Sequence, residues 1–440
     1  MFSSNLIKRN LLFKFCFLLI FTGIGLAKPE SSSGYPWNDF INGPKSSRNF
    51  GSLKKNDSLL VGLEPYLGRQ SKPLHLRSPG QNLILKDSKG ITYKSSSITI
   101  EWQKISLEYP KTIVRNIAGP FSSFESAEQF ALRLRKIGIN SDIAHPMDWE
   151  VWVDEETQIP DGINLIRKTQ IRTYQIRPVL KGNNLDLLLS GPITIHAPEG
   201  LIFKKGIYRG PFLLKADAYG SWTLVEKVSF PQYLQGVVPH EIGPQAPSTA
   251  LAVQAVLART WALANMHRFS IDGYHLCSDV QCQVYQNPGK ASFRIKKAIQ
   301  NTSGKFLSWK GKPIHAVYHA TNGGVMASAD EAWAMPALPY LVSKLDGSSQ
   351  WRDQFALPIQ SNSLAQSLLS KKEGAYGGNH YLFRWKRIFT TKKLHKALTH
   401  FFPEMELPKS IKILNRGPSG RVLSLAILGS DQKILHVLRL

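Results

Sequence analysis

The chain has 440 residues, enough for about three domains at the usual ~150 residues per domain. It carries 55 Lys and Arg against 31 Asp and Glu, a formal charge of +24, and 42% of its residues are hydrophobic. This hydrophobic content excludes wholesale disorder, and three cysteines exclude a scaffold built on disulfides. The positive charge favours an anionic partner such as nucleic acid, a membrane surface or an acidic cell-wall polymer.

Residues 1–27 have the features of a secretory signal. Lys8 and Arg9 precede an apolar run, residues 11–20, and Gly25-Leu26-Ala27 offers small residues where a signal peptidase cuts. The run is short for the ~30 Å hydrocarbon core of a bilayer, and an uncleaved membrane anchor is the alternative. We therefore expect an exported protein of the periplasm or cell envelope. Cleavage after Ala27 removes three cations and no acid, so the mature chain keeps most of its positive charge.

The remainder of the chain alternates between strand-like and helix-like stretches. Residues 28–57, rich in Ser, Pro and Gly, are expected to form a linker. Short β-prone runs predict strands at residues 59–63, 83–85, 98–102, 193–195 and 222–228. Hydrophobic periodicity predicts helices over 361–370 and 391–402 and strands over 411–414 and 422–428. We expect an α+β fold, with mixed β-sheets around a buried central helix and a small αβ insert.

The central helix is expected over residues 250–264, with Ser248 as its N-cap. Only Gln254, Arg259 and Thr260 are polar in this stretch. A helix that is apolar on every side is buried, and unpaired polar groups are costly there. Gln254 and Arg259 must therefore find partners.

Glu241 precedes this helix, within Pro239-His240-Glu241-Ile242-Gly243-Pro244. We expect this segment to form a turn that leads toward the helix. A carboxyl group at the edge of an apolar element is a candidate for a raised pKa. Glu241 is therefore a candidate general acid.

Cys277 and Cys282 lie five residues apart, and His275 lies two residues before the first of them. These three side chains could supply three ligands of a tetrahedral zinc site, because thiolates favour zinc over calcium or magnesium. In an exported protein the same pair could form a local disulfide, and free thiols are the third alternative.

Residues 314–324 are expected to form a strand that ends in a polar turn containing Gly323-Gly324. His315 fits an ordinary alternation on a half-buried strand, whereas His319 lies next to the turn. His319, Thr321 and Asn322 are therefore candidates for binding a ligand.

Several spaced motifs now resemble one family, that of stage II sporulation protein D (SpoIID/LytB). The resemblance covers about residues 59–440, with an insert at residues 105–180. The matching residues are Tyr233-Leu234, Gly236–Pro239, Glu241, Ala250-Leu251, Gln254-Ala255, Ala258–Thr260, Cys277, Cys282–Tyr285, Gly323-Gly324, Trp351 and Ser419–Val422.

Within the insert, the sequence predicts a strand, a helix over 125–136 with Gly138 at its C-cap, and a second strand. This stretch resembles a SPOR-type repeat, a small module that binds peptidoglycan glycan stripped of its peptides. The matching residues are Ile117–Ser122, Ala127-Glu128, Leu132–Leu134 and Gly138-Ile139. The alternative is an αβ hairpin of the main domain.

The family resemblance implies a lytic transglycosylase that cleaves the MurNAc-GlcNAc strands of peptidoglycan, with Glu241 as its catalytic carboxylic acid. It also implies a zinc site, although Gln281 stands where family members commonly carry His. His319, Thr321 and Asn322 are then expected to bind sugar hydroxyls, and Tyr233 to shape the cleft. An acid role for Glu241 excludes a close cation, so we expect Arg259 to pair elsewhere.

Other classes of function remain to be weighed against this one. Some relatives are thought to be non-catalytic enhancers of a cell-wall amidase, so a wall-binding enhancer is the main alternative. A hydrolase with a cysteine nucleophile lacks a convincing Cys-His-Asn arrangement. The export signal and the absence of a recognition-helix or zinc-finger pattern disfavour nucleic acid as the partner.

Overall fold

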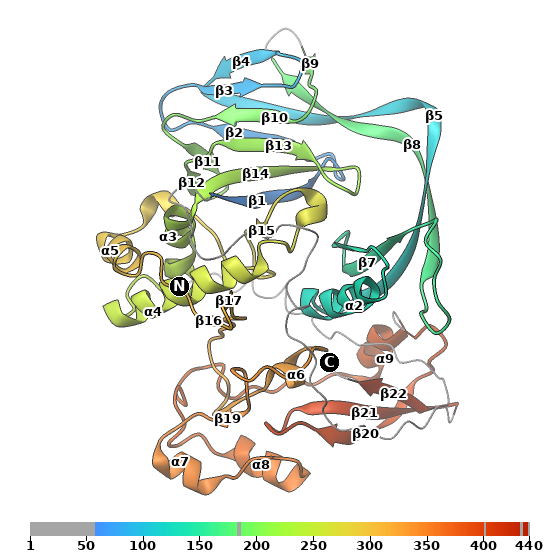
Figure 1. The fold of residues 1–440 in the computed structure, drawn as a ribbon, viewed down its shortest axis with the longest axis vertical. Helices are drawn as coiled ribbons and strands as arrows, with labels where there is room; N and C mark the ends of the chain where they lie inside the picture. Colours follow the sequence, from blue (N-terminus) through green and yellow to red (C-terminus); the bar gives the residue numbers. More distant parts are fainter. Residues whose placement is uncertain (1–57, 183–185, 400–401, 432–433, 439–440) are drawn as a thin grey trace.

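The computed structural model describes residues 58–438, apart from 183–185, 400–401 and 432–433. The expected signal and linker lie outside the described residues. The described part contains no helix that is both long and apolar enough to span a membrane. Figure 1 shows an upper part built from sheets and helices, and a lower part formed by the last third of the chain. The expected α+β class, with mixed sheets, is confirmed.

A seven-stranded sheet forms the centre of the upper part, in the order β15-β1-β14-β13-β10-β3-β4. Its strands pair antiparallel except β1 and β15, which are parallel. The alternation of buried and exposed side chains fits a half-buried sheet, as in β10, where two isoleucines are buried and the threonine between them is exposed. The strands are β1 (Ser58–Leu67), β3 (Leu83–Lys86), β4 (Thr92–Ser95), β10 (Ile193–His196), β13 (Phe212–Ala216), β14 (Trp222–Ser229) and β15 (Leu276–Cys277).

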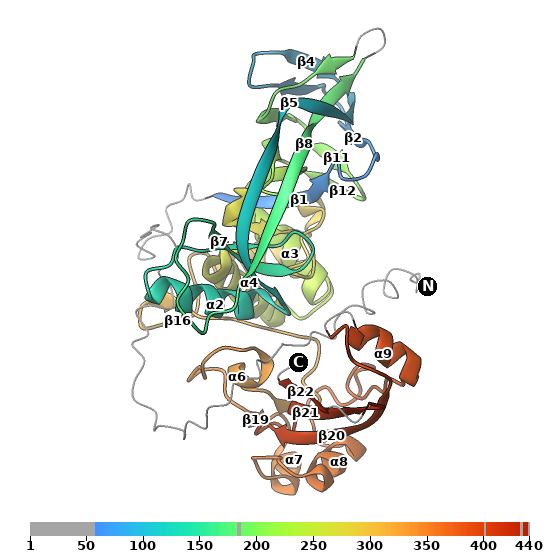
Figure 2. The ribbon, with the colours of Figure 1, turned by 90° about the vertical axis from the view of Figure 1, so that its right-hand side faces the viewer.

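A second sheet contains eight strands and includes a long two-stranded ribbon. The ribbon consists of β5 (Ser97–Phe121) and β8 (Ile166–Lys181), which pair antiparallel over most of their length. It leaves the upper sheets and runs down one side of the molecule (Figure 2). The other strands are β2 (Leu74–Arg77), β6 (Asp142–Ala144), β7 (Trp149–Asp154), β9 (Leu187–Leu188), β11 (Leu201–Phe203) and β12 (Gly206–Tyr208).

The far end of the ribbon carries the predicted αβ insert. Helix α2 (Phe124–Lys136) is capped by the Ser123 hydroxyl, which accepts from the Ser126 N–H, and it ends before Gly138, whose φ is +84°. The predicted order of strand, helix and strand is confirmed. The likeness to a SPOR repeat stays a prediction.

Arg268 connects this insert to the rest of the upper part through hydrogen bonds. Its buried guanidinium donates to the Glu125 carboxylate at the start of α2 and to the Asn265 side chain at the end of α4. It also lies over the Phe124 and Trp261 rings. A charge-assisted hydrogen bond inside an aromatic cluster fixes the position of α2 relative to α4.

Three helices pack together beside the central sheet: α3 (Phe230–Glu241), which contacts β1 and β14, α4 (Ser248–Asn265) and α5 (Phe293–Asn301). Helix α4 is the predicted central helix and is largely buried, although Val253 is exposed. The expectation that Ser248 is the N-cap of α4 was wrong. Because the Leu251 N–H donates to the Pro247 carbonyl, the cap is Pro247 and Ser248 already belongs to the first turn.

Short elements complete the upper part. They are two 3₁₀ turns, Ser270–Asp272 between α4 and β15 and Pro288–Lys290 between β15 and α5, and the hairpin of β16 (Ser308–Trp309) and β17 (Lys312–Pro313), which follows α5. The strand expected over residues 314–319 was wrong, since β17 ends at Pro313. Beyond that residue the chain crosses between the two parts, where it pairs with no strand that the structure describes.

The lower part consists of short helices around a three-stranded antiparallel sheet (Figure 1). The predicted helix and strand positions of this region are confirmed to within a few residues. Its strands are β18 (Val325–Met326), β19 (Lys344–Leu345), β20 (Pro408–Arg416), β21 (Val422–Gly429) and β22 (Ile434–Leu438). Its helices are α6 (Ala329–Ala332), α7 (Ser349–Gln354), α8 (Asn362–Ser370) and α9 (Thr391–Thr399).

Trp351 organises the start of this lower part. Its ring is fully buried, and its indole N–H donates to the Gly324 carbonyl at 2.8 Å. A Cβ on Gly324 would lie 2.5 Å from this ring, and the φ of Gly324 is +91°. Both the backbone conformation and the close approach therefore require glycine.

We predict that Gly324→Ala lowers the stability of the lower part more than Gly377→Ala does. Gly377 also has a positive φ, +72°, but open space around its Cβ position. The left-handed backbone costs about 1 kcal/mol in both variants, whereas the clash with Trp351 adds roughly 1–3 kcal/mol only at Gly324. Thermal unfolding of both variants measures this difference, and equal shifts of the midpoint would contradict the packing argument.

Candidate active site

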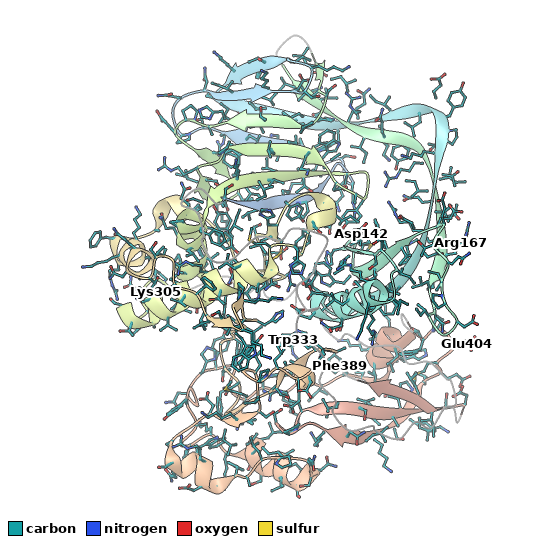
Figure 3. All side chains as sticks on the ribbon, viewed as in Figure 1. Asp142, Arg167, Lys305, Trp333, Phe389 and Glu404 are labelled. Carbon is teal, nitrogen blue, oxygen red and sulfur yellow. A yellow bond between two sulfur atoms is a disulfide. The ribbon has the colours of Figure 1, made fainter. Side chains whose placement is uncertain are left out.

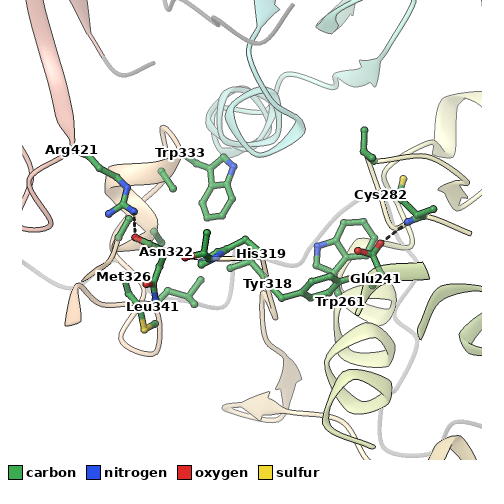
Figure 4. A pocket seen from close by; sticks show the side chains of 17 residues that line it. Glu241, Trp261, Cys282, Tyr318, His319, Asn322, Met326, Trp333, Leu341 and Arg421 are labelled. Atoms are coloured by element: carbon green, nitrogen blue, oxygen red, sulfur yellow. Dashed lines mark hydrogen bonds between the residues drawn. The ribbon is translucent and has the colours of Figure 1, made fainter. Parts of the chain in front are cut away.

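A pocket of about 490 Å³ lies where the upper and lower parts meet (Figure 4). The upper part contributes the end of α3, one tryptophan of α4 and the loop after β15. The crossing segment and the lower part supply the other walls, and Trp333 lies in this region between the two parts (Figure 3). The lining residues are Glu241, Trp261, Val280, Cys282, Val284, Val317, Tyr318, His319, Thr321, Asn322, Met326, Ala327, Ala329, Ala332, Trp333, Leu341 and Arg421.

Glu241 is the last residue of helix α3, so the expected turn at this position was wrong. The helix begins with a capping box, in which the Ser229 hydroxyl accepts from the Gln232 N–H and the Gln232 side chain accepts from the Ser229 N–H. Pro231 stands in the first turn, where its missing N–H is not needed. The pattern of Ser229 and Gln232, with Pro231 between them, is visible in the sequence and could have predicted the start of the helix.

The Glu241 carboxyl group is half-buried and accepts two hydrogen bonds. Its Oε1 accepts from the Val284 N–H at 2.7 Å, and the Tyr318 hydroxyl donates to the same carboxyl group. Burial raises the pKa of Glu241 above its ordinary value, and the two hydrogen bonds oppose part of this rise. The expected direction of the pKa shift is confirmed.

Arg259 does not pair with Glu241. Its guanidinium donates to the Lys305 carbonyl at 2.8 Å and to the Ile299 carbonyl at 3.5 Å, on the side of α4 that faces α5. The expectation that Arg259 pairs elsewhere is confirmed. The carboxyl group of Glu241 therefore escapes a cation that would lower its pKa.

A chain of side-chain hydrogen bonds leads from the core to Glu241. The Tyr233 hydroxyl donates to Gln283 Oε1, and Gln283 Nε2 donates to the Tyr318 hydroxyl oxygen, both at 3.0 Å. Because that oxygen already accepts from Gln283, its proton is directed at Glu241. Tyr233 itself is 0% exposed and lines no part of the pocket, so its expected place in the cleft was wrong.

Gln254, on α4, is the second polar residue behind Tyr318. It is 4% exposed, and its Nε2 makes no hydrogen bond of regular geometry with the described residues. It lies close enough to the Tyr318 hydroxyl to lower the pKa of that group, although burial raises the pKa overall. Gln254 is thus a buried polar neighbour of Tyr318 that does not line the pocket.

His319, Thr321 and Asn322 all line the pocket, as expected for ligand-binding residues. The Asn322 carboxamide is already engaged, since it donates to the Asp346 carboxylate at 2.6 Å and accepts from the Gly324 N–H at 2.8 Å. It therefore shapes the glycine turn. His319 and Thr321 stay predicted ligand-binding residues, and partial burial beside Arg421 lowers the pKa of His319.

Besides Tyr318, three polar or aromatic lining residues stand out for which the sequence predicted no role. Trp261 and Trp333 place two aromatic rings in the pocket, and Arg421 donates to the Val325 and Asn322 carbonyls at 3.1 Å (Figure 4). Trp261 lies on a helix that is apolar all round, so its sequence neighbours give no sign of its exposure to a pocket. Arg421 lies about 180 residues from Glu241 in the chain.

Cys277 and Cys282 form a disulfide, one of the predicted alternatives. His275 Nδ1 accepts from the Leu60 N–H at 3.1 Å in the β1–β15 pairing. The described residues contain no group of three His, Cys, Asp or Glu side chains that could hold a metal ion. As arranged here, His275, Cys277 and Cys282 do not fit zinc, and zinc binding stays a prediction for the reduced chain alone.

Comparisons with known proteins place two matches on this chain. Residues 218–309 match the family described as Stage II sporulation protein (SpoIID), and residues 327–438 match a domain of unknown function. The first match contains Glu241 and the disulfide. The expected resemblance is therefore confirmed for this region.

Similar curated proteins include an uncharacterised protein of Brachyspira hyodysenteriae, 33% identical over 41% of this chain and 48% of its own length. The amidase enhancer of Bacillus subtilis is 33% identical over 26% of this chain and 15% of its own length. Stage II sporulation protein D of Bacillus amyloliquefaciens is 31% identical over 27% of this chain and 39% of its own length. The matches thus span about half or less of each relative.

We predict that a fragment of residues 28–440 resists alkylation by iodoacetamide until it is reduced. It contains only Cys277 and Cys282, and the disulfide occupies both sulfur atoms. Mass spectrometry should show no added label before reduction and two labels after it. Two labels without reductant, together with one zinc ion per chain by elemental analysis, would contradict the disulfide.

Proposed function

We propose that this chain is an exported lytic transglycosylase that cleaves MurNAc-GlcNAc strands of peptidoglycan, because residues 218–309 match the SpoIID family. One observation carries the proposal. Among the residues that line the pocket, Glu241 has the only carboxyl group, and its pKa is raised. A cell-wall role is also what the names of the relatives support.

A single carboxyl group fits transglycosylation better than hydrolysis. Glycosidases that use water need two carboxyl groups, one as the acid and the other as a nucleophile or base. In transglycosylation the 6-hydroxyl of the muramyl sugar is the nucleophile, so no second group is needed to activate water. The carboxyl group of Glu241 can act first as the acid that protonates the glycosidic oxygen. The same group can then act as the base that accepts the proton of the 6-hydroxyl.

The proposed reaction begins with protonated Glu241. The carboxyl group gives its proton to the glycosidic oxygen as the bond from that oxygen to C1 of MurNAc breaks. The 6-hydroxyl of the same MurNAc then attacks C1, and the Glu241 carboxylate accepts the hydroxyl proton. The products are a 1,6-anhydro-muramyl end and a free 4-hydroxyl on GlcNAc, and Glu241 ends protonated.

The remaining pocket residues suit a glycan substrate. Trp261 and Trp333 offer ring faces against which sugar rings pack. Arg421, together with the overall charge of +24, suits the lactyl carboxylates of muramyl residues. We assign His319 and Thr321 to binding of sugar hydroxyls.

A second candidate function is enhancement of a cell-wall amidase without catalysis. It is favoured by the 33% identity to the amidase enhancer of Bacillus subtilis, over 113 residues. In that case the pocket would bind glycan and present it to a partner enzyme, and Glu241 would have no chemical role.

We predict that Glu241→Gln lowers the release of 1,6-anhydro-muramyl products from peptide-stripped glycan at least about 100-fold, because general acid catalysis contributes roughly 10²–10⁴. Residues 28–440 suffice for the assay, since every contact described here lies within residues 58–438. Mass spectrometry identifies the products. Glu373→Gln, an exposed carboxyl group outside the pocket, is the control and should retain activity.

The result also separates the two candidate functions. Product formation by the wild type and the control alone supports the transglycosylase. If no variant releases products while all of them bind glycan and stimulate an amidase, the enhancer function replaces it.

We further predict that Tyr318→Phe moves the alkaline limb of the pH-rate profile to higher pH. The general acid acts in its protonated form, so activity falls as the pH rises through the pKa of Glu241. The Tyr318 hydroxyl favours the carboxylate, and its removal therefore raises this pKa. Tyr340→Phe, outside the pocket lining, should leave the limb in place, and a limb that moves to lower pH in Tyr318→Phe would contradict the assignment.

A further inference from the structure

A basic and apolar surface lies on the end of the segment before α9 and on the first turn of that helix. Every residue from 385 to 393 is exposed, and we refer to these nine residues as the 385–393 surface. Its large apolar side chains are Trp385, Ile388 and Phe389, which are 72%, 81% and 46% exposed. Its cations are Lys386, Arg387, Lys392 and Lys393. No acidic residue occurs in the sequence between Glu373 and Glu404.

The base of this surface is firmly held. Phe383 is buried, and the Arg384 guanidinium donates to the backbone carbonyls of Leu368 at 2.7 Å, Leu369 at 2.9 Å and Gly323 at 2.8 Å. At the other end, Leu398 of α9 is fully buried. Trp385 and Ile388 are therefore presented to solvent by a backbone that is fixed on both sides.

The composition of the surface points to a lipid bilayer. Single exposed apolar residues are ordinary, but three large ones within five residues, among four cations, match the interfacial segments of peripheral membrane proteins. Tryptophan favours the headgroup region, and each Lys or Arg near an anionic surface adds about 1 kcal/mol of attraction.

A glycan fits this surface less well than a bilayer does. Ile388, the most exposed of the three apolar side chains, has no ring face on which a sugar could pack.

We propose that the 385–393 surface docks this protein on an anionic membrane, with Trp385 and Ile388 at the boundary between headgroups and acyl chains and the cations against lipid phosphates. Arg384 links this surface to Gly323, in the turn beside the pocket. Docking would therefore hold the pocket at a set distance from the membrane. This role is independent of whether the pocket is catalytic.

Co-sedimentation of residues 28–440 with lipid vesicles tests the proposal. We expect binding to vesicles that contain phosphatidylglycerol and phosphatidylcholine, and weak binding to phosphatidylcholine alone. Lys386→Gln with Arg387→Gln should weaken binding about tenfold or more, as expected for two lost cations. Trp385→Ser with Ile388→Ser should weaken it comparably.

Matched controls use equally exposed residues elsewhere. Tyr109→Ser with Ile171→Ser, on the β5/β8 ribbon, changes two exposed apolar side chains, and Lys296→Gln with Lys297→Gln, on α5, changes two adjacent cations. Both controls should bind like the wild type. All substituted residues are exposed, and circular dichroism verifies that each variant is folded.

Three outcomes would overturn the proposal. The first is an absence of binding to phosphatidylglycerol vesicles at low salt. The second is an equal loss of binding in the controls and the surface variants. The third is that the surface variants keep vesicle binding and instead lose binding to glycan strands, or lose self-association in sedimentation velocity, which would identify a glycan or a second copy of the chain as the occupant.

Discussion

The hydrogen bond from the Val284 N–H to Glu241 joins the two segments on which the site depends. It connects the end of helix α3 to the segment that directly follows the Cys277–Cys282 disulfide. The crossing segment adds Tyr318, whose hydroxyl oxygen accepts a hydrogen bond from Gln283 of that same segment. Three stretches that are distant in sequence therefore converge on one carboxyl group. Partial burial raises its pKa, and these hydrogen bonds limit the rise.

Helix α4 provides the support for this arrangement. Its apolar surface packs within the core, which leaves its few polar side chains to be satisfied individually. Arg259 is drawn to carbonyl groups on the side of α5, and Gln254 faces Tyr318. Arg259 and Gln254 therefore interact with different parts of the structure, although both lie on α4. The positive charge of Arg259 is directed away from Glu241, and Gln254 contacts the tyrosine beside Glu241.

Much of this account could be predicted from the sequence, because the relevant signals are local. The long apolar run of α4, the strand-helix-strand order of the insert and the β-prone runs of the central sheet all predicted the right elements. The helix ending at Glu241 was missed although its capping box, Ser229 and Gln232, is a local signal.

Other features depend on contacts that no local pattern encodes. Residues 314–319 have a strand-like composition but no strand beside them, because the chain crosses between two parts there. The burial of Tyr233 and the arrival of Arg421 at the pocket follow from tertiary packing alone. The cysteine pair was compatible with both zinc and a disulfide, since both use the same short spacing.

The central claim is that the protein holds Glu241 ready to act as an acid, and a direct titration of this group tests it. Carbon NMR of a sample labelled at the glutamate carboxyl carbons, compared with Glu241→Gln, isolates the resonance of Glu241. The account predicts a midpoint above the ordinary glutamate pKa of about 4.3. A midpoint at or below that value would contradict it, because the carboxyl group would then be held as the carboxylate and could not supply the proton.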